Sequence, residues 1–162
     1  MKTQKEKDIE NVYDNILKQI IEPLSGDKTT YLSELNGIGK KLFGVKFKGV
    51  FPSDKIPKLN DLSPYAILNL DTTKQPGSHW VSIAKHPPVR GKPRTDETLL
   101  YDSFARKGSK IIKSLAYSGN GRIVDNDLKD AEQRLEETNC GARCLAWLVV
   151  VEKYGWDLAK LI

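Results

Sequence analysis

The chain has 162 residues, a mass of 18.2 kDa, 39% hydrophobic residues and 29% charged residues. This size and composition fit one compact domain spanning residues 1–162, and they exclude collagen-like, low-complexity and disordered classes. The longest nearly continuous apolar run, residues 145–151, is far below the roughly 18 residues of a membrane span, and the first residues are polar, unlike a signal peptide. We therefore expect a protein that is neither secreted nor embedded in a membrane.

The formal net charge is +5 and the pI is about 9.1. Many of the basic residues lie between residues 40 and 58, so a polyanion such as DNA is a candidate partner, although a charge this small also serves solubility. Two cysteines four residues apart, Cys140 and Cys144, do not make a disulfide framework. The two histidines have no second cysteine pair beside them, so we expect no metal site and no required cofactor.

The first predicted element is an amphipathic helix over residues 5–21, where apolar residues recur every three or four positions. We expect this N-terminal part, residues 1–22, to be accessory to the domain. A short helical stretch follows over residues 30–35. Closely spaced glycines then break the periodicity. Residues 40–58 are therefore predicted to form a basic loop, anchored at the edge of the core by three phenylalanines: Phe43, Phe47 and Phe51.

Three runs with strand composition follow: residues 65–70, 79–84 and 98–102. Their connections are compatible with hairpins. A helical pattern over residues 108–117 and a short extended piece over residues 122–124 come next. The most apolar helix, residues 141–154, is hydrophobic nearly all the way round, which indicates burial on every side. The predicted fold class is therefore α+β, with a mostly antiparallel central sheet packed on one buried helix.

Cys140 stands at the predicted start of the buried helix, with Asn139 as a natural cap. The unpaired N–H groups of a helix start carry partial positive charge, which favours thiolate over thiol. Gly141 leaves no side chain to obstruct approach to the sulfur. A buried structural cysteine explains the same position equally well. Cys144, one turn deeper, is expected to be plain core.

A reactive cysteine needs a base, and His79 opens a predicted strand beside a flexible loop. His86 precedes two prolines and is expected to be a solvated loop residue. Asp102 ends an apolar run on a neighbouring strand, where it would accept a hydrogen bond from an imidazolium or simply start a turn. Gln133 has an amide that would serve as an oxyanion donor, although a surface glutamine is the commoner explanation.

Taken together, these residues resemble a family. The resemblance is to the adenain-type cysteine proteases, the maturation proteases of adenoviruses, with relatives in virophages, giant viruses and Maverick-type elements. The same order of residues is shared by the eukaryotic SUMO-specific proteases. It is carried by four stretches in order, namely Gly77-Ser78-His79-Trp80, Tyr101-Asp102-Ser103-Phe104, Gln133 and Asn139-Cys140-Gly141. The most specific feature is the seven-residue step from Gln133 to Cys140, with Cys144 in the next turn.

The resemblance implies an adenain-like fold and a role for each matching residue. Cys140 would be the nucleophile, His79 the general base and acid, Asp102 the residue that orients His79, and Gln133 a donor to the oxyanion. Three further residues would line the substrate cleft: Trp80, Asn69 and Gly141.

The chain also departs from the family pattern. Adenain carries a glutamate where this chain has Asp102. No third cysteine is present to attach an activating peptide. Activation by DNA along the basic surface remains open. The N-terminal helix has no counterpart in the family, which suggests a role in docking or substrate choice.

The leading hypothesis is a monomeric thiol endopeptidase of viral or virus-derived origin. It would cleave capsid precursors at Gly-Gly or Gly-X sites and would be found in the virion and in the host cytoplasm or nucleus. A deconjugating peptidase for ubiquitin-like modifiers would use the same four residues. A third hypothesis is a non-catalytic, basic nucleic-acid-binding module.

Overall fold

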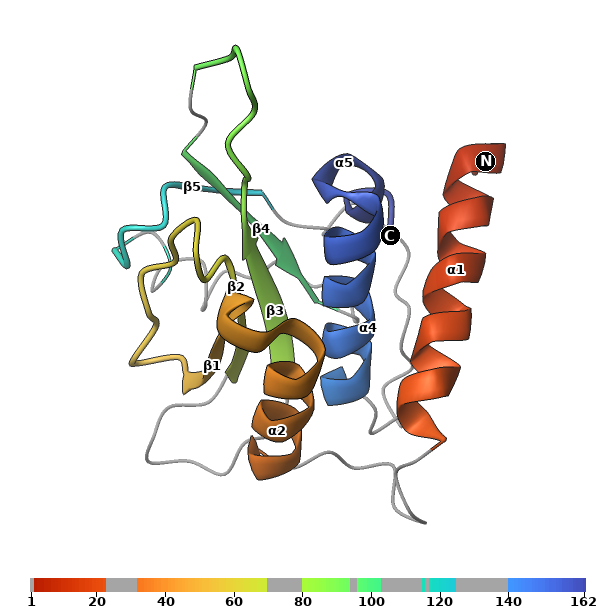
Figure 1. Ribbon diagram of the computed structural model, residues 1–162, viewed down its shortest axis with the longest axis horizontal. Helices are drawn as coiled ribbons and strands as arrows, with labels where there is room; N and C mark the ends of the chain where they lie inside the picture. The colour runs from red at the N-terminus through yellow and green to blue at the C-terminus, as the bar shows by residue number, and fades with distance from the viewer. Residues whose placement is uncertain are drawn as a thin grey trace.

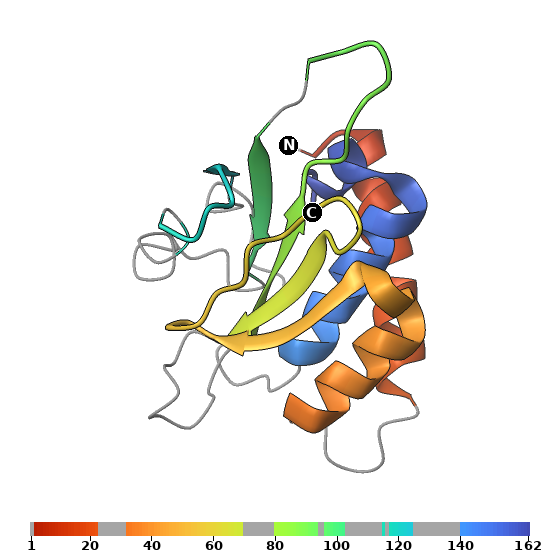
Figure 2. The ribbon, with the colours of Figure 1, turned by 60° about the vertical axis from the view of Figure 1, so that its left-hand side comes forward.

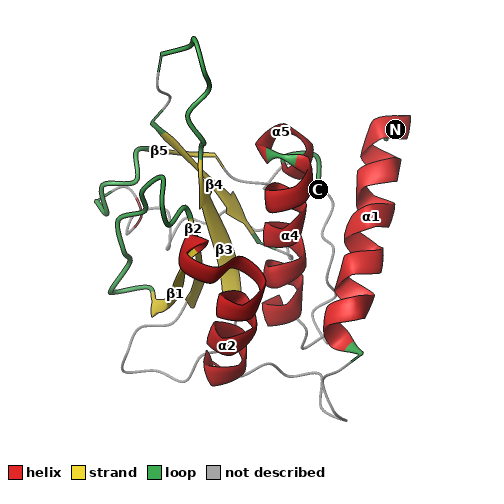
Figure 3. Ribbon diagram, in the orientation of Figure 1, coloured by secondary structure: helices red, strands yellow, loops and turns green. Residues whose placement is uncertain are grey.

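The structure is a computed structural model, and it describes residues 2–22, 32–69, 80–93, 96–102, 115, 117–124 and 140–162. Figure 1 shows the elements, and Figure 3 separates helices from strands. The helices are α1 (Gln4–Ile21), α2 (Leu32–Phe43), the 3₁₀ turn η1 (Gly44–Lys46), α4 (Cys140–Tyr154) and α5 (Trp156–Ala159). The strands are β1 (Phe47–Pro52), β2 (Tyr65–Asn69), β3 (Trp80–Lys85), β4 (Glu97–Tyr101) and β5 (Arg122–Val124).

The five strands form one sheet in the order β1-β2-β3-β4-β5. The pairs β2/β3 and β3/β4 are antiparallel, whereas β1/β2 and β4/β5 are parallel. The α+β class is confirmed, but the prediction of a mostly antiparallel sheet is wrong, because the sheet is mixed. The error arises at the edges: β1 comes from residues predicted to be loop, and β5 reaches its place through a crossover, which a parallel neighbour requires.

Helices α1, α2 and α4 cover one face of the sheet (Figure 2). Helix α4 is buried from Cys140 to Val151, as its all-round hydrophobicity predicts. Helix α1 begins one residue before the predicted start, and its apolar face, Ile9, Tyr13 and Leu17, is buried in the same core. Within the described residues, no helix is both long enough and apolar enough to cross a membrane.

Helix α2 is longer than predicted, since it continues through Gly37 and Gly39 to Phe43. Its buried residues, Leu35, Gly39 and Phe43, are spaced by four and share one face. A side chain at Gly39 would overlap the ring of Phe47 on β1, so this glycine permits a close helix–strand approach and does not end the helix. The predicted loop over residues 40–58 is therefore wrong from residue 40 to residue 52, which are helix, 3₁₀ turn and strand.

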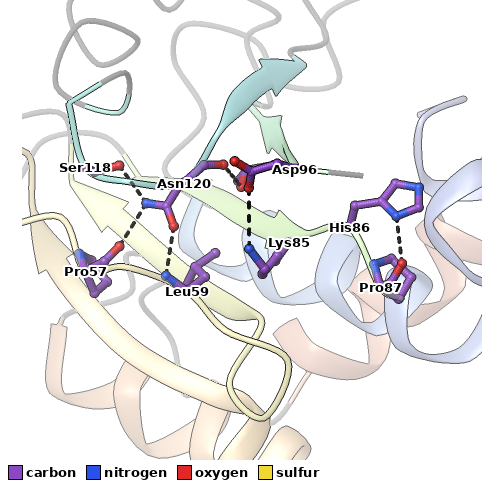
Figure 4. Close-up of polar contacts among 9 residues, drawn as sticks. Pro57, Leu59, Lys85, His86, Pro87, Asp96, Ser118 and Asn120 are labelled. Atoms are coloured by element: carbon purple, nitrogen blue, oxygen red, sulfur yellow. Dashed lines mark hydrogen bonds and ion pairs between the residues drawn. The ribbon is translucent and has the colours of Figure 1, made fainter. Parts of the chain in front are cut away.

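The second face of the sheet carries a smaller apolar cluster, made by Leu59, Ala66, Leu68, Val81, Ile83, Leu100 and Leu115. Asn120, fully buried, ties the covering segments to it (Figure 4). Its amide oxygen accepts from the Leu59 N–H at 2.8 Å, and its amide nitrogen donates to the Pro57 carbonyl at 2.9 Å. Its own carbonyl accepts from Thr98 of β4 at 2.7 Å. One asparagine thus joins residues 57–59 to the sheet.

The predicted strands are confirmed to within one or two residues at each end, and residues 122–124 form β5 as predicted. The predicted helix over residues 108–117 lies largely outside the described residues. The sequence does not predict the short helix α5, because Gly155 directly follows the predicted helix and glycine commonly ends one. In the structure Gly155 has a φ of 95°, and a new helix begins at Trp156.

At the end of α4, Glu152 links two other elements. It accepts from Tyr65 of β2 at 2.6 Å and from Lys46 of η1 at 2.6 Å. Burial works to raise the pKa of Glu152, but the bonds from Lys46 and Tyr65 and the Lys46 charge outweigh it, so the pKa is lowered. Burial, followed by the bond to Glu152, raises the pKa of Tyr65. The ionised form of Glu152 is the one that the fold stabilises.

Two glycines of α2 provide a matched test of this packing. We expect Gly39→Ala to lower the free energy of unfolding by about 1–3 kcal/mol, because the new methyl group meets the Phe47 ring. Gly37 is exposed with no atom near its missing side chain, so Gly37→Ala should raise that free energy by about 0.5–1 kcal/mol through helix propensity. Urea unfolding followed by circular dichroism measures both. Two stabilising substitutions would show that Gly39 does not touch β1.

The Glu152 contacts predict a pH-dependent contribution to stability. At neutral pH, Glu152→Gln should lower the free energy of unfolding by less than about 1 kcal/mol, since the pair with Lys46 is partly exposed. The lowered pKa of Glu152 means that its contribution is present above the ordinary value of 4.5 and is lost as the pH falls below it. Urea titrations at pH 7 and pH 3 should therefore show a difference between wild type and variant only at pH 7. A difference that grows on acidification would contradict the assignment.

Candidate functional site

The sheet topology brings together one end of each of the three central strands, β2, β3 and β4. This end of the sheet is called the candidate edge. Because β3 is antiparallel to β2 and to β4, the start of β3 lies beside the ends of both neighbours. Asn69, the last residue of β2, is paired with Trp80, the first of β3. Tyr101, the last of β4, is paired with Ser82, and Asp102 follows it. The pairing therefore sets Asn69 beside Trp80 and leaves Asp102 one residue beyond the end of β4, at the same end of the sheet.

Helix α4 begins at the same edge. In Figures 1 and 2 its first turn, in light blue, lies at the end of the sheet where β3 begins and β4 finishes. The Trp147 ring of α4 stacks on the Tyr101 ring, with centroids 5.3 Å apart and planes 6° apart. Cys140, the first residue of α4, belongs to the same apolar cluster as Trp80. The structure therefore brings Cys140 to the edge that carries Asn69, Trp80 and Asp102.

The two cysteines of α4 differ in their surroundings. Cys144 is 1% exposed, and burial, with a smaller effect of Cys140, raises its pKa well above the ordinary value. The Ser82 hydroxyl opposes this rise and Asp102 adds to it. Ser82 Oγ is buried and has no hydrogen bond of ordinary geometry to the described residues, so its contact with the thiol is weak. Cys144 is thus a protonated core thiol, and both Cys140 and Asp102 lie within electrostatic reach of it.

Cys140 is 7% exposed, as the first residue of its helix, and its free thiol is in the first turn. The helix start predicted from the sequence is confirmed to within one residue. The N–H groups of this first turn have no partners within the helix and carry partial positive charge. Gly141, the next residue of the helix, is also buried. Cys140 is thus a free, nearly buried thiol at the start of a helix.

Asp102, Asn69 and Trp80 are each buried, with 5%, 5% and 7% of their surface exposed. A carboxylate buried to this extent is costly unless charged or polar groups compensate it. An asparagine at the end of a buried strand has the same requirement. Asn69 and Asp102 thus place two buried polar side chains at the ends of β2 and β4, on either side of the start of β3.

His79 and Gln133 lie outside the described residues, so the structure does not test their predicted positions. The described chain does show that Trp80, the residue after His79, opens β3 at the candidate edge. Of the other predicted residues, Asn69 and Trp80 are paired across β2 and β3, Cys140 and Asp102 both act electrostatically on the Cys144 thiol, and Gly141 follows Cys140 in α4.

His86 is at the other end of β3, far along the strand from Trp80 (Figure 4). Its ring lies 4.5 Å from that of Trp156, and Nδ1 is 2.8 Å from the carbonyl of Pro87. The prediction of a loop residue is confirmed, since His86 follows the end of β3, but its ring is partly covered by Trp156 of α5 and is not fully solvated. This contact depends on α5, which no sequence pattern predicts. Its place supports the choice of His79 over His86 as the partner of Cys140.

Sequence reasoning missed three residues near the edge: Ser82, Tyr13 and Arg143. Ser82 interrupts an otherwise apolar strand, and Arg143 is a cation within the most apolar helix of the chain. Either interruption was a visible signal of a buried polar contact. Tyr13 gave none, because an aromatic residue in the apolar stripe of an amphipathic helix is ordinary core.

No protein-family model matches the chain, and no curated protein matches it at a significant level. The assignment of a function therefore rests on the residues themselves and on their arrangement.

The different surroundings of the two thiols predict selective alkylation. Iodoacetamide at neutral pH should modify Cys140 in the native protein and leave Cys144 unmodified, because Cys144 is protonated and buried. Peptide mapping by mass spectrometry locates the adduct. Native Cys140→Ala should incorporate no label, and unfolding in urea should expose Cys144. Equal labelling of both native thiols, or of neither, would contradict this description.

Proposed function

We propose that the protein is a cysteine endopeptidase with Cys140 as its nucleophile. The observation that carries the proposal is the placement of Cys140, at the first turn of a buried helix, on the sheet edge that also holds Asp102, Asn69 and Trp80. A thiol at a helix start and a buried carboxylate one strand away are two parts of a cysteine–histidine–carboxylate site. His79 is the proposed third part, since the next residue in the chain opens β3 at this edge.

In the proposed mechanism, His79 removes the proton from the Cys140 thiol, and the sulfur attacks the carbonyl carbon of the scissile peptide bond. Gln133 and the Cys140 N–H donate to the oxygen of the tetrahedral intermediate. His79 then gives the proton to the departing amine, which leaves a thioester on Cys140. Water, deprotonated by His79, attacks the thioester, and the acid and the free thiol are released. Asp102 holds the imidazole in the orientation that both transfers require.

The proposed substrate is an extended polypeptide with small residues at the cleavage site. The resemblance to adenain-type proteases supports viral capsid precursors cut at Gly-Gly or Gly-X sites. In this proposal Trp80 narrows the cleft that grips the extended substrate, so glycine passes where a larger side chain would collide. The same resemblance underlies our proposal of a monomeric enzyme of the virion and the host cytoplasm or nucleus.

DNA stays a proposed activator. Two lysines of the basic segment are already engaged within the protein, since Lys40 donates to the Phe47 carbonyl at 2.8 Å and Lys46 pairs with Glu152. Any DNA contact would therefore depend on the exposed lysines around them, such as Lys41, Lys55 and Lys58. The structure offers no specific observation that favours DNA binding as the main activity.

The test uses peptides with one central Gly-Gly or Gly-X pair, together with a viral capsid precursor that contains such pairs. Wild-type protein should cleave both, and Cys140→Ala should reduce the rate to background, because it removes the nucleophile. Mass spectrometry of the products locates the cut bonds.

Cys144→Ala is the matched control, because it removes a second α4 thiol that is buried and protonated. It should retain cleavage despite some loss of stability. If Cys140→Ala cleaves at the wild-type rate, the protease proposal is wrong. If only a probe with a ubiquitin-like C-terminus labels Cys140, and short peptides are not cut, the deconjugating alternative replaces it.

A further inference from the structure

A chain of buried polar contacts connects α1 to the candidate site. The hydroxyl groups of Tyr13 on α1 and Tyr101 on β4 lie 2.7 Å apart, and either can donate. Arg143 of α4 donates from Nη1 to the Tyr13 hydroxyl at 3.3 Å. Both tyrosines are fully buried, and Arg143 is 9% exposed. The Tyr13 hydroxyl thus joins three elements that are far apart in the sequence.

The two residues that Tyr13 contacts are neighbours of the proposed catalytic groups. Tyr101 directly precedes Asp102, and it is the last residue of β4. Arg143 stands three residues after Cys140, within one helical turn of it. A bond from Tyr13 to each therefore links the end of the strand that carries the carboxylate to the turn that carries the sulfur.

The ring contacts show that this arrangement is specific. The Tyr13 and Tyr101 rings meet edge to face, with centroids 6.1 Å apart and planes 63° apart. The other face of Tyr101 is fixed by its stacking on Trp147. Burial raises the pKa of Asp14, and the Arg143 charge opposes the rise, so Arg143 acts on α1 at a second residue. Apolar packing alone would need neither hydroxyl nor the guanidinium.

A purely structural role for α1 would be met by phenylalanine at position 13. Burying two hydroxyl groups and a guanidinium costs free energy unless their hydrogen bonds form, and an apolar core avoids that cost. The hydrogen bonds of Tyr13 add a directional restraint, because a hydrogen bond fixes the relative position of its donor and acceptor more narrowly than an apolar contact does. The part of the molecule whose position it fixes is the end of β4 relative to the start of α4.

We infer that Tyr13 is a positioning residue of the proposed protease: through Tyr101 and Arg143 it sets the position of Asp102 relative to Cys140, and it makes α1 part of the site. This inference rests on the proposed function. It assigns to α1 a task that its sequence did not reveal, in place of the accessory role expected of residues 1–22. Loss of the hydroxyl should misplace the carboxylate and lower the rate of reaction without weakening substrate binding.

The test compares wild type with Tyr13→Phe, Tyr101→Phe and the double variant in steady-state peptide cleavage. Each variant should lower kcat by about tenfold or more with KM unchanged, since sub-ångström displacement of catalytic groups has effects of this order. The double variant should lose no more than Tyr13→Phe, because that variant already removes the bonds of the Tyr13 hydroxyl to both Tyr101 and Arg143. The rate of Cys140 alkylation, measured across pH, should change its profile in the same variants.

Tyr65→Phe is the matched control, since it removes another tyrosine hydroxyl with a buried bond, at 2.6 Å to Glu152, at the opposite end of β2. It should reduce thermal stability and leave kcat and the alkylation profile unchanged. The inference is overturned if Tyr13→Phe retains wild-type kcat, or if Tyr65→Phe lowers kcat equally. Failure of the proposed function is detected separately: if Cys140→Ala cleaves at the wild-type rate, the protease proposal is wrong, whatever the tyrosine variants do.

Discussion

The arrangement of the whole site depends on the docking of α4 against β4 through the Trp147–Tyr101 stack. Trp147 is 1% exposed and its indole N–H donates to the Ala159 carbonyl of α5 at 3.1 Å, so it cannot slide along the sheet. Aromatic pairs with near-parallel planes lose contact quickly when displaced. This stack therefore fixes how far the first turn of α4 lies from the end of β4, and every proposed role of Cys140 and Asp102 follows from that distance.

Several buried polar and charged side chains gather at the edge that results. Asn69, Ser82, Asp102 and Arg143 are buried at or near it, whereas the other buried polar residues described, Lys85, Thr98 and Asn120, lie away from it, and Thr98 and Asn120 are bonded to each other. Buried polar groups cost free energy, and proteins accept them mainly where function needs them. The concentration of such groups at one sheet edge, beside a thiol at a helix start, is the physical reason for placing the reaction there.

Much of this fold is visible in the sequence, but only where a single pattern decides it. The all-round hydrophobicity of α4 and the stripe of α1 have one explanation each, and both helices were predicted. The predicted form of helix α2 is too short, because glycines such as Gly37 and Gly39 usually indicate the end of a helix. In the structure Gly39 lies within the helix and makes room for the Phe47 ring. The edge strands β1 and β5 depend on partners distant in the sequence. Likewise Cys140 and Asp102 were identified from their local settings, but the Tyr13 contact exists only in three dimensions.

The central claim is that one pocket joins Cys140 to His79, Asp102 and Gln133. A crystal structure of the protein treated with a peptidyl chloromethyl ketone ending in Gly-Gly tests it most directly. The account predicts a covalent bond from the Cys140 sulfur to the inhibitor, with the His79 imidazole between that sulfur and the Asp102 carboxylate and with the Gln133 amide facing the inhibitor oxygen. An unmodified Cys140, or an imidazole on a different face of the molecule, would contradict it.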